Sequence, residues 1–173
     1  MGYSTEFEGH FTVAPPLKPV HAAFLKKFSV TRRVKRNERI TAGLPDPERV
    51  AVGLPPGTEG AFYVGNEGGD YRGTAEWRAA LPSLGVVDYN QPPAGQPGLW
   101  CQWVPTPDGA GIEWNEGEKF YDYDQWLQYL IDQFLQPWGY TVSGSISWSG
   151  EEEEDVGILE VTGNVVRSRF GES

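Results

Sequence analysis

Hydrophobic and polar positions along the chain follow two different periods, and each period predicts a type of element. Residues 3–13 alternate between apolar and polar side chains, which predicts a half-buried strand. After two prolines, apolar residues recur at spacings of three and four, and this spacing predicts a helix from Pro19 to about Arg33. Both elements expose one side and bury the other, so each needs a partner layer.

The densest apolar block covers residues 99–150 and predicts the order strand, turn, strand, helix, strand. It holds six of the seven tryptophans, and aromatic side chains bury large areas, so we expect most of the core here. The helix is predicted from Asp122 to Leu135, with Asp122 and Gln125 as a capping pair and Pro137 beyond its end. An alternating segment over 140–148 predicts the next strand.

Turn residues divide the remainder of the chain. Residues 40–60 and 88–98 are rich in proline and glycine and are predicted as long surface loops. A short strand is predicted at 61–65 and a short helix at 74–80. Two final strands flank Gly163 and Asn164, a two-residue hairpin signal.

These elements predict the α+β class in one domain over residues 1–173. We expect a mainly antiparallel sheet of about five to seven strands, with two principal helices on one face. Gly9 and Gly144 fall on strand faces predicted to be buried, where a glycine lets a helix or an aromatic ring approach closely.

Composition limits the class of protein. No apolar run approaches the roughly 18 residues of a membrane span, so no membrane association is predicted. The amino-terminal segment has neither the basic nor the apolar region of a secretion signal. The single cysteine, Cys101, excludes an internal disulfide and a cysteine-based zinc site. These features predict a cytoplasmic protein.

The formal net charge of −10 is unevenly distributed along the chain. Residues 1–60 carry nine Lys and Arg against six acids, whereas residues 100–173 carry three bases against fourteen acids. Such asymmetry affects the choice of partner and the rate of association. Because contact with phosphates needs a basic surface, direct binding of nucleic acid is not expected.

Two charged runs are the candidate binding residues. The first is the acidic run Glu151, Glu152, Glu153, Glu154 and Asp155, which is either a solvated loop or a surface that engages a basic partner. The second is the basic run Arg32, Arg33, Lys35 and Arg36, which is either a solvated helix end or a contact for a phosphate or an acidic partner.

Catalytic chemistry has weaker support. Carboxylates gather between Glu113 and Asp124, where they could act as acid and base or bind a cation, or could serve the helix dipole and a solvated turn. His10 and His21 are the only histidines, and no nucleophile-elbow pattern is present. We therefore predict no catalytic residue, no metal site and no cofactor.

The chain resembles a family of small proteins from bacteria and their phages or other mobile elements. The resemblance is carried by residues 98–105, 118–121, 126–127, 129–130 and 137–140, and by Trp148 with Gly150 and Glu151. No activity is associated with that family, so the resemblance assigns no site. It implies an accessory protein that acts on a host or defence system.

Together these observations predict a non-enzymatic, acidic binding protein that engages a protein partner with a basic surface. The resemblance extends this prediction to an inhibitor encoded by a phage or mobile element. The alternative prediction is a small enzyme that uses the carboxylates near Glu113–Asp124. A third, weaker prediction is a nucleic-acid binder that uses Arg32–Arg39.

Overall fold

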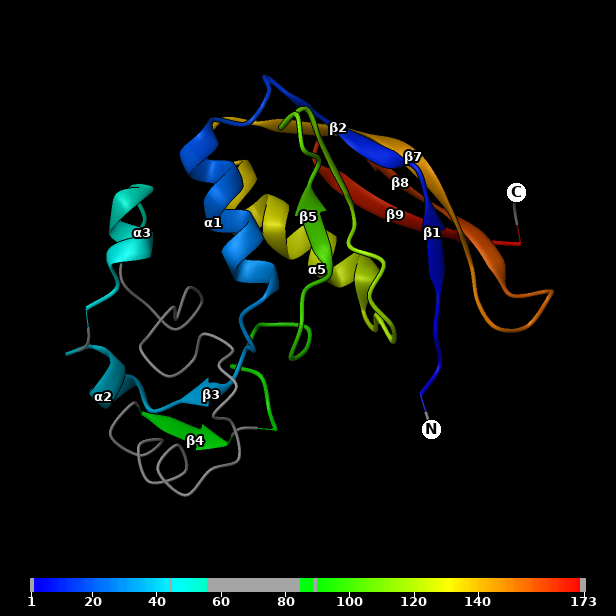
Figure 1. Cartoon of the computed structure of the whole chain (residues 1–173). Helices are drawn as coiled ribbons and strands as arrows, with labels where there is room; N and C mark the ends of the chain where they lie inside the picture. The colour runs from blue at the N-terminus through cyan, green and yellow to red at the C-terminus, as the bar shows by residue number, and fades with distance from the viewer. Residues whose placement is uncertain (1, 44, 56–84, 89, 172–173) are drawn as a thin grey trace. The chain divides into compact units, whose positions relative to one another are not determined.

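A computed structural model describes residues 2–43, 45–55, 85–88 and 90–171 (Figure 1). The chain forms two compact units, one of Met1–Ala22 with Cys101–Ser173 and the other of Ala23–Trp100. The single domain expected from the sequence stays a prediction. The strand predicted at 61–65 and the helix predicted at 74–80 lie outside the described residues.

The first unit is built on one antiparallel sheet, in agreement with the predicted α+β class. Its seven strands lie in the order β5-β6-β2-β7-β8-β9, with β1 also paired to β7. Their bounds are β1 Glu6–Glu8, β2 His10–Ala14, β5 Trp103–Pro105, β6 Gly111–Trp114, β7 Thr141–Ser149, β8 Val156–Thr162 and β9 Val165–Phe170. Strands from both ends of the sequence therefore share this sheet.

The predicted first strand is interrupted at Gly9. Gly9 has a φ of +103°, a backbone conformation that favours glycine, and this residue separates β1 from β2. Gly144 in β7 has a φ of +126°. Both glycines are exposed, so the predicted burial of this strand face was wrong, although a Cβ at Gly9 would lie 3.2 Å from the Ile146 side chain. The backbone conformation is what requires glycine at these two positions.

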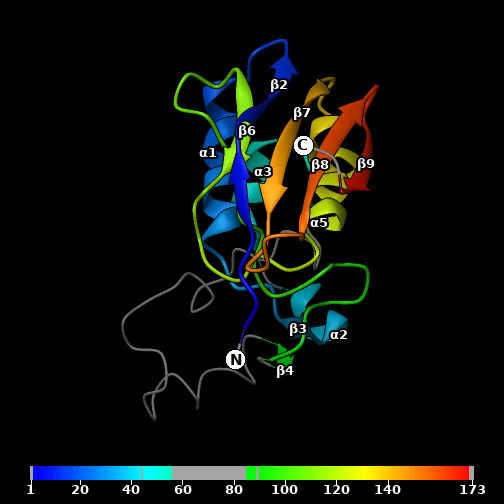
Figure 2. The same cartoon turned by 90° about the vertical axis from the view of Figure 1, so that its right-hand side faces the viewer.

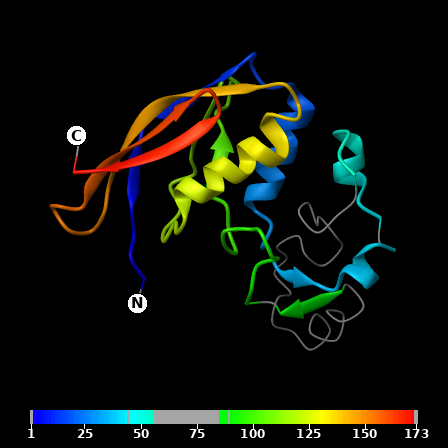
Figure 3. The ribbon, with the colours of Figure 1, turned by 180° about the vertical axis from the view of Figure 1, so that it is seen from behind.

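The long helix of this unit changes its winding midway. Helix α5 spans Tyr123–Leu130 and continues as the π-helical segment η2, Ile131–Leu135. Asp122 has a left-handed φ of 55° and makes no capping hydrogen bond through its side chain, so the predicted capping pair was wrong. The apolar side of α5 and η2 packs on one face of the sheet (Figure 3).

The core of the first unit joins that helix to the sheet. Phe7 makes edge-to-face contacts with several aromatic rings, at centroid distances of 5.2 Å to Trp103 and 4.9 Å to Tyr123. Of the six tryptophans in the 99–150 block, Trp103, Trp126 and Trp148 are buried and the other three are half-buried. The block is therefore mainly core, as its periodicity predicted.

The second unit contains short elements. They are β3 Lys35–Arg36 paired with β4 Val86–Asp88, and the helices α2 Glu38–Thr41 and α3 Pro47–Ala51. The two helices occupy part of the segment predicted as a loop, because the side chains of Asn37 and Asp46 accept hydrogen bonds from the amides of Arg39 and Arg49.

Helix α1, Pro19–Ser29, crosses the boundary between the two units. It ends before the predicted Arg33. The hydroxyls of Ser29 and Thr31 donate to the last-turn carbonyls of Lys26 and Lys27, each at 2.7 Å, and such bonds compete with continuation of the helix. Its placement on the sheet face beside α5 stays a prediction.

Candidate functional site

The acidic run Glu151–Asp155 forms the connection between β7 and β8 in the first unit. Glu151, Glu152, Glu153 and Glu154 are exposed, and Asp155 is half-buried. The loop closes on itself through Gly150, whose amide donates to the Asp155 carbonyl at 2.7 Å. The four glutamates are thus presented on an ordered turn.

Tyr3 fastens this turn to the amino-terminal segment. Its hydroxyl donates to the Asp155 carboxylate and accepts from the Glu151 amide at 3.0 Å, while the Ser4 amide donates to Glu151 Oε1 at 2.6 Å. The hydrogen bond to Asp155 raises the pKa of Tyr3 above its ordinary value, because losing the phenolic proton would break that bond. The first residues of the chain therefore order the acidic loop.

Strand β1 adds two more acids to the same end of the sheet. Glu6 lies opposite Ser149 and Glu8 opposite Ser147, and both glutamates are exposed. The acidic surface therefore consists of Glu6, Glu8 and Glu151–Glu154. The alternating pattern put Glu6 and Glu8 on the polar face of a strand, but only the long-range pairing of β1 with β7 brings them beside the loop.

The basic run lies in the second unit, where its side chains have different environments. Arg32 is half-buried, with its guanidinium 5.9 Å from the Trp100 ring centroid and a hydrogen bond of 3.2 Å to Asn90 Oδ1. Lys35 is exposed. Arg32 and Lys35 are thus the members of the run that reach the surface.

Arg33 and Arg36 point inward, with 1% and 6% of their surface exposed. Arg33 donates from Nε to Gln96 Oε1 at 3.1 Å, and its guanidinium lies 4.2 Å over the Phe28 ring. A partner could reach either guanidinium only after displacing the residues that cover it. We therefore do not include Arg33 and Arg36 in an interaction surface.

A buried acid accompanies these arginines. Asp46 is 2% exposed and accepts from the Arg49 amide at 3.3 Å, and Arg49 Nε donates to the Pro55 carbonyl at 2.5 Å. Burial raises the pKa of Asp46, and the charges of Arg49 and Arg33 partly oppose that shift. This arrangement organises the interior of the second unit.

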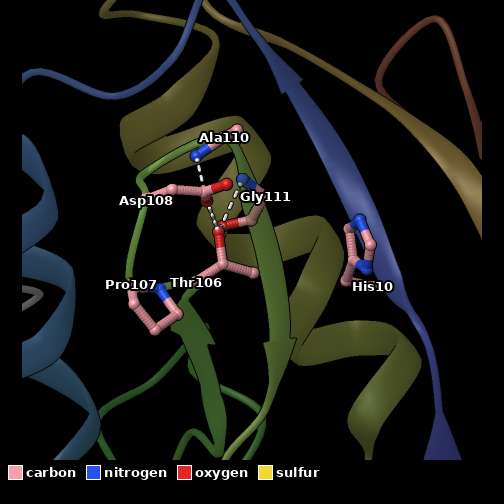
Figure 4. Close-up of a pocket in the computed structure, with 6 residues that line it drawn as sticks. All are labelled: His10, Thr106, Pro107, Asp108, Ala110 and Gly111. Atoms are coloured by element: carbon pink, nitrogen blue, oxygen red, sulfur yellow. Dashed lines mark hydrogen bonds between the residues drawn. The ribbon is translucent and has the colours of Figure 1, made fainter.

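A shallow cavity of about 340 Å³ opens beside the β5–β6 turn (Figure 4). His10 faces it from β2, and Asp108 lies on the turn. Asp108 Oδ1 accepts from the Thr106 hydroxyl at 2.6 Å and from the Ala110 amide at 3.0 Å. The Thr106 hydrogen bond is the main cause that lowers the pKa of Asp108, and nearby His10 adds to it. The polar groups of Asp108 and Thr106 are therefore engaged in hydrogen bonds within the turn.

A second histidine site was not predicted. His21 stacks on Trp138 at a centroid distance of 4.1 Å, and its Nδ1 lies 2.7 Å from the buried hydroxyl of Tyr140. That hydroxyl also accepts from the Lys18 amide at 3.0 Å. No local signal in the sequence joins these residues, because they are brought together only by the fold.

The carboxylates of the alternative enzyme prediction do not line the described cavity. Glu116, Glu118 and Asp122 are exposed on the segment after β6, and Glu113 and Asp124 are half-buried. Within the described ranges, no group of three or more His, Cys, Asp or Glu side chains is arranged to hold a metal ion.

Cys101 is buried. In the part of the chain that the structure describes, no helix has the length and apolar character to cross a membrane. Comparison of the chain with models of known protein families, with curated proteins and with solved structures finds no match.

Proposed function

We propose that this protein is a non-enzymatic binding protein whose acidic surface engages a protein partner with a basic surface. The observation that supports this most is the ordered β7–β8 turn. Its exposed glutamates are held in place by Tyr3, and Glu152, Glu153 and Glu154 form no ion pair with any described residue.

The electrostatics of the chain suit this role. Exposed carboxylates keep most of their hydration until contact, so pairing them with lysine or arginine at the rim of an interface mainly raises the association rate. A net charge of −10 strengthens the attraction of a basic partner and repels nucleic acid. The interaction should therefore weaken with salt, since screening shortens the range of the field.

The resemblance to proteins of phages and mobile elements narrows the kind of partner. We propose a host or defence protein met in the cytoplasm, whose basic groove the acidic surface occupies. The enzyme alternative stays a prediction, and no observation among the described residues favours it over binding.

The test is capture of partners by the immobilised protein from a lysate of the host cell. The E153Q/E154Q variant neutralises two acids of the turn, and E116Q/E118Q neutralises two exposed acids elsewhere with the same change in net charge. We expect a partner retained at low salt and released at high salt. Its affinity should fall about threefold to tenfold in E153Q/E154Q only.

Two results would contradict the proposal. One is that no protein is retained at low salt. The other is retention that E153Q/E154Q and E116Q/E118Q weaken equally, because that would indicate a response to net charge alone.

A further inference from the structure

Strand β9 is the last strand of the sheet and leaves one edge unpaired by any described strand (Figure 2). Edge strands expose backbone donors and acceptors that can pair with another chain, and proteins usually protect them. How far β9 is protected can be deduced from its hydrogen bonds.

Successive backbone amides of β9 point alternately toward β8 and toward the open edge of the sheet. The Gly171 amide donates to Val156 of β8 at 2.7 Å, whereas the Val166 amide donates away from β8, to Gln128 Oε1 at 2.8 Å. Successive residues of an antiparallel strand alternate in this direction. The amides of Ser168 and Phe170 therefore also face the open edge.

Gln128 of α5 protects only the beginning of this edge. Its side-chain amide donates to the Asn164 carbonyl at 2.9 Å, and its oxygen receives the Val166 amide. The half of β9 that contains Ser168 and Phe170 lies beyond the reach of this side chain. A strand of another protein could therefore pair there without displacing a backbone hydrogen bond to any described residue.

An apolar platform accompanies the open half. Phe170 is 72% exposed and contacts the buried Trp148 edge-to-face, at 5.4 Å between ring centroids. Trp148 in turn lies over Gly157, which pairs with Phe170 in the register of β8 and β9. An apolar side chain of an added strand would gain contact area on Phe170.

The charges on the other face of β9 indicate the chemistry of the partner. Arg167 is exposed and forms no ion pair with a described residue, whereas Arg169 pairs with Glu160 at 3.3 Å. A second copy of this chain paired antiparallel about Ser168 would set Arg167 opposite Arg169, and like charges directly opposite are destabilising. An acidic strand avoids that repulsion.

We propose that the Ser168–Phe170 half of β9 binds an extended, acidic segment of a protein partner by strand addition. The segment accepts hydrogen bonds from the Ser168 and Phe170 amides, places an apolar side chain on Phe170 and sets a carboxylate opposite Arg167. This surface uses other residues than the acidic surface, although the two are neighbours, since the Gly171 amide donates to Val156 directly after the acidic turn.

The test uses the full chain and a short blocked peptide of alternating valine and glutamate. Amide exchange and chemical shifts are followed by NMR at peptide concentrations up to about 1 mM, where weak peptide contacts are detectable. We expect the Ser168 and Phe170 amides to gain protection while the Val166 amide, already bonded to Gln128, changes little.

Two variants distinguish a loss of peptide pairing at β9 from a loss of the fold. S168P removes a donor that faces the open edge and leaves the bonds to β8 intact, so the Arg167 and Arg169 amides should stay protected. R167E reverses the local charge, and K26E, at an exposed position of α1, makes the same change in net charge. Affinity should fall at least about fivefold in S168P and R167E and stay unchanged in K26E.

A matching peptide of alternating valine and lysine distinguishes this inference from the proposed function. It should shift the amides of the acidic loop and leave Ser168 and Phe170 unaffected. The inference is overturned if the glutamate peptide leaves both β9 amides unprotected, or if R167E and K26E act alike. Self-association that protects the same amides would also overturn it, in favour of a second copy.

Discussion

The imidazole of His21 lies between the Trp138 ring and the Tyr140 hydroxyl. Because that hydroxyl accepts from the Lys18 amide, its own proton is available to Nδ1 of a neutral imidazole. Burial lowers the pKa of His21 below its ordinary 6.5, and the positive charge of Lys18 lowers it further. The folded environment therefore favours the neutral form of this histidine.

The preference of His21 for its neutral form predicts that the free energy of unfolding depends on pH. Since the folded pKa is the lower one, His21 contributes its full stabilisation above about pH 6.5, and the contribution is lost as the pH falls through the folded pKa. Urea unfolding between about pH 5 and pH 8 measures it. The free energy of unfolding should change less with pH in H21Q than in the unchanged chain. H10Q, at the exposed histidine, should keep the original pH dependence. An equal pH dependence in the two variants would contradict the prediction.

Gly157 is required for a steric reason. A Cβ at this position would overlap the Trp148 indole and the Arg169 carbonyl oxygen, and the backbone oxygen cannot move away freely. We expect G157A to lower the free energy of unfolding by about 1–3 kcal/mol, measured by urea denaturation. In G43A the new methyl would meet its nearest atom at 3.7 Å, so that variant should change little.

At the scale of elements, local periodicity was sufficient to predict the strands and helices with the clearest hydrophobic pattern. Strand β7, the hairpin at Gly163 and Asn164 and the apolar side of α5 were all predicted, because each depends on neighbours in sequence. Gly163 and Asn164 have φ values of 56° and 67°, as a two-residue hairpin of this kind requires.

What sequence reasoning missed depends on distant pairing. The register that sets Glu6 opposite Ser149 has no local signal, and neither does the covering of Arg33 by Gln96 and Phe28. A run of like charges has the same pattern whether its members are exposed or buried. Half of the basic run was therefore assigned to the surface although it lies inside.

Gln128 joins two elements and gives a prediction at this scale. Its side chain bonds the Asn164 carbonyl and the Val166 amide, so it fixes the β8–β9 hairpin against α5. In Q128A the Val166 amide should exchange faster with solvent. The free energy of unfolding should fall by about 0.5–1.5 kcal/mol for each hydrogen bond lost. Exchange of the Val142 amide, which donates to Asn164 Oδ1 at 2.6 Å, is the internal reference. Unchanged exchange at Val166 would contradict the role.

For the whole molecule, the excess of negative charge has a measurable effect. Ten net negative charges repel one another more in the folded state than in the expanded unfolded chain. We expect the Tm to rise between about 10 mM and 150 mM NaCl, where the screening length falls from about 30 Å to 8 Å. The rise should be smaller in both E153Q/E154Q and E116Q/E118Q than in the unchanged chain, because each variant removes two negative charges. A Tm that falls with salt would contradict this.

Strand β2 lies between β6 and β7, and this position has a consequence for synthesis on the ribosome. Phe11 pairs with Ile112 and Val13 with Val142, so β2 must stay without these partners until Ile112 and Val142 have been translated. At about 5–20 residues per second, that interval is on the order of ten seconds. Throughout it, an alternating strand is open to capture by chaperones or by neighbouring nascent chains, and the sheet can be completed only after β7 has been translated.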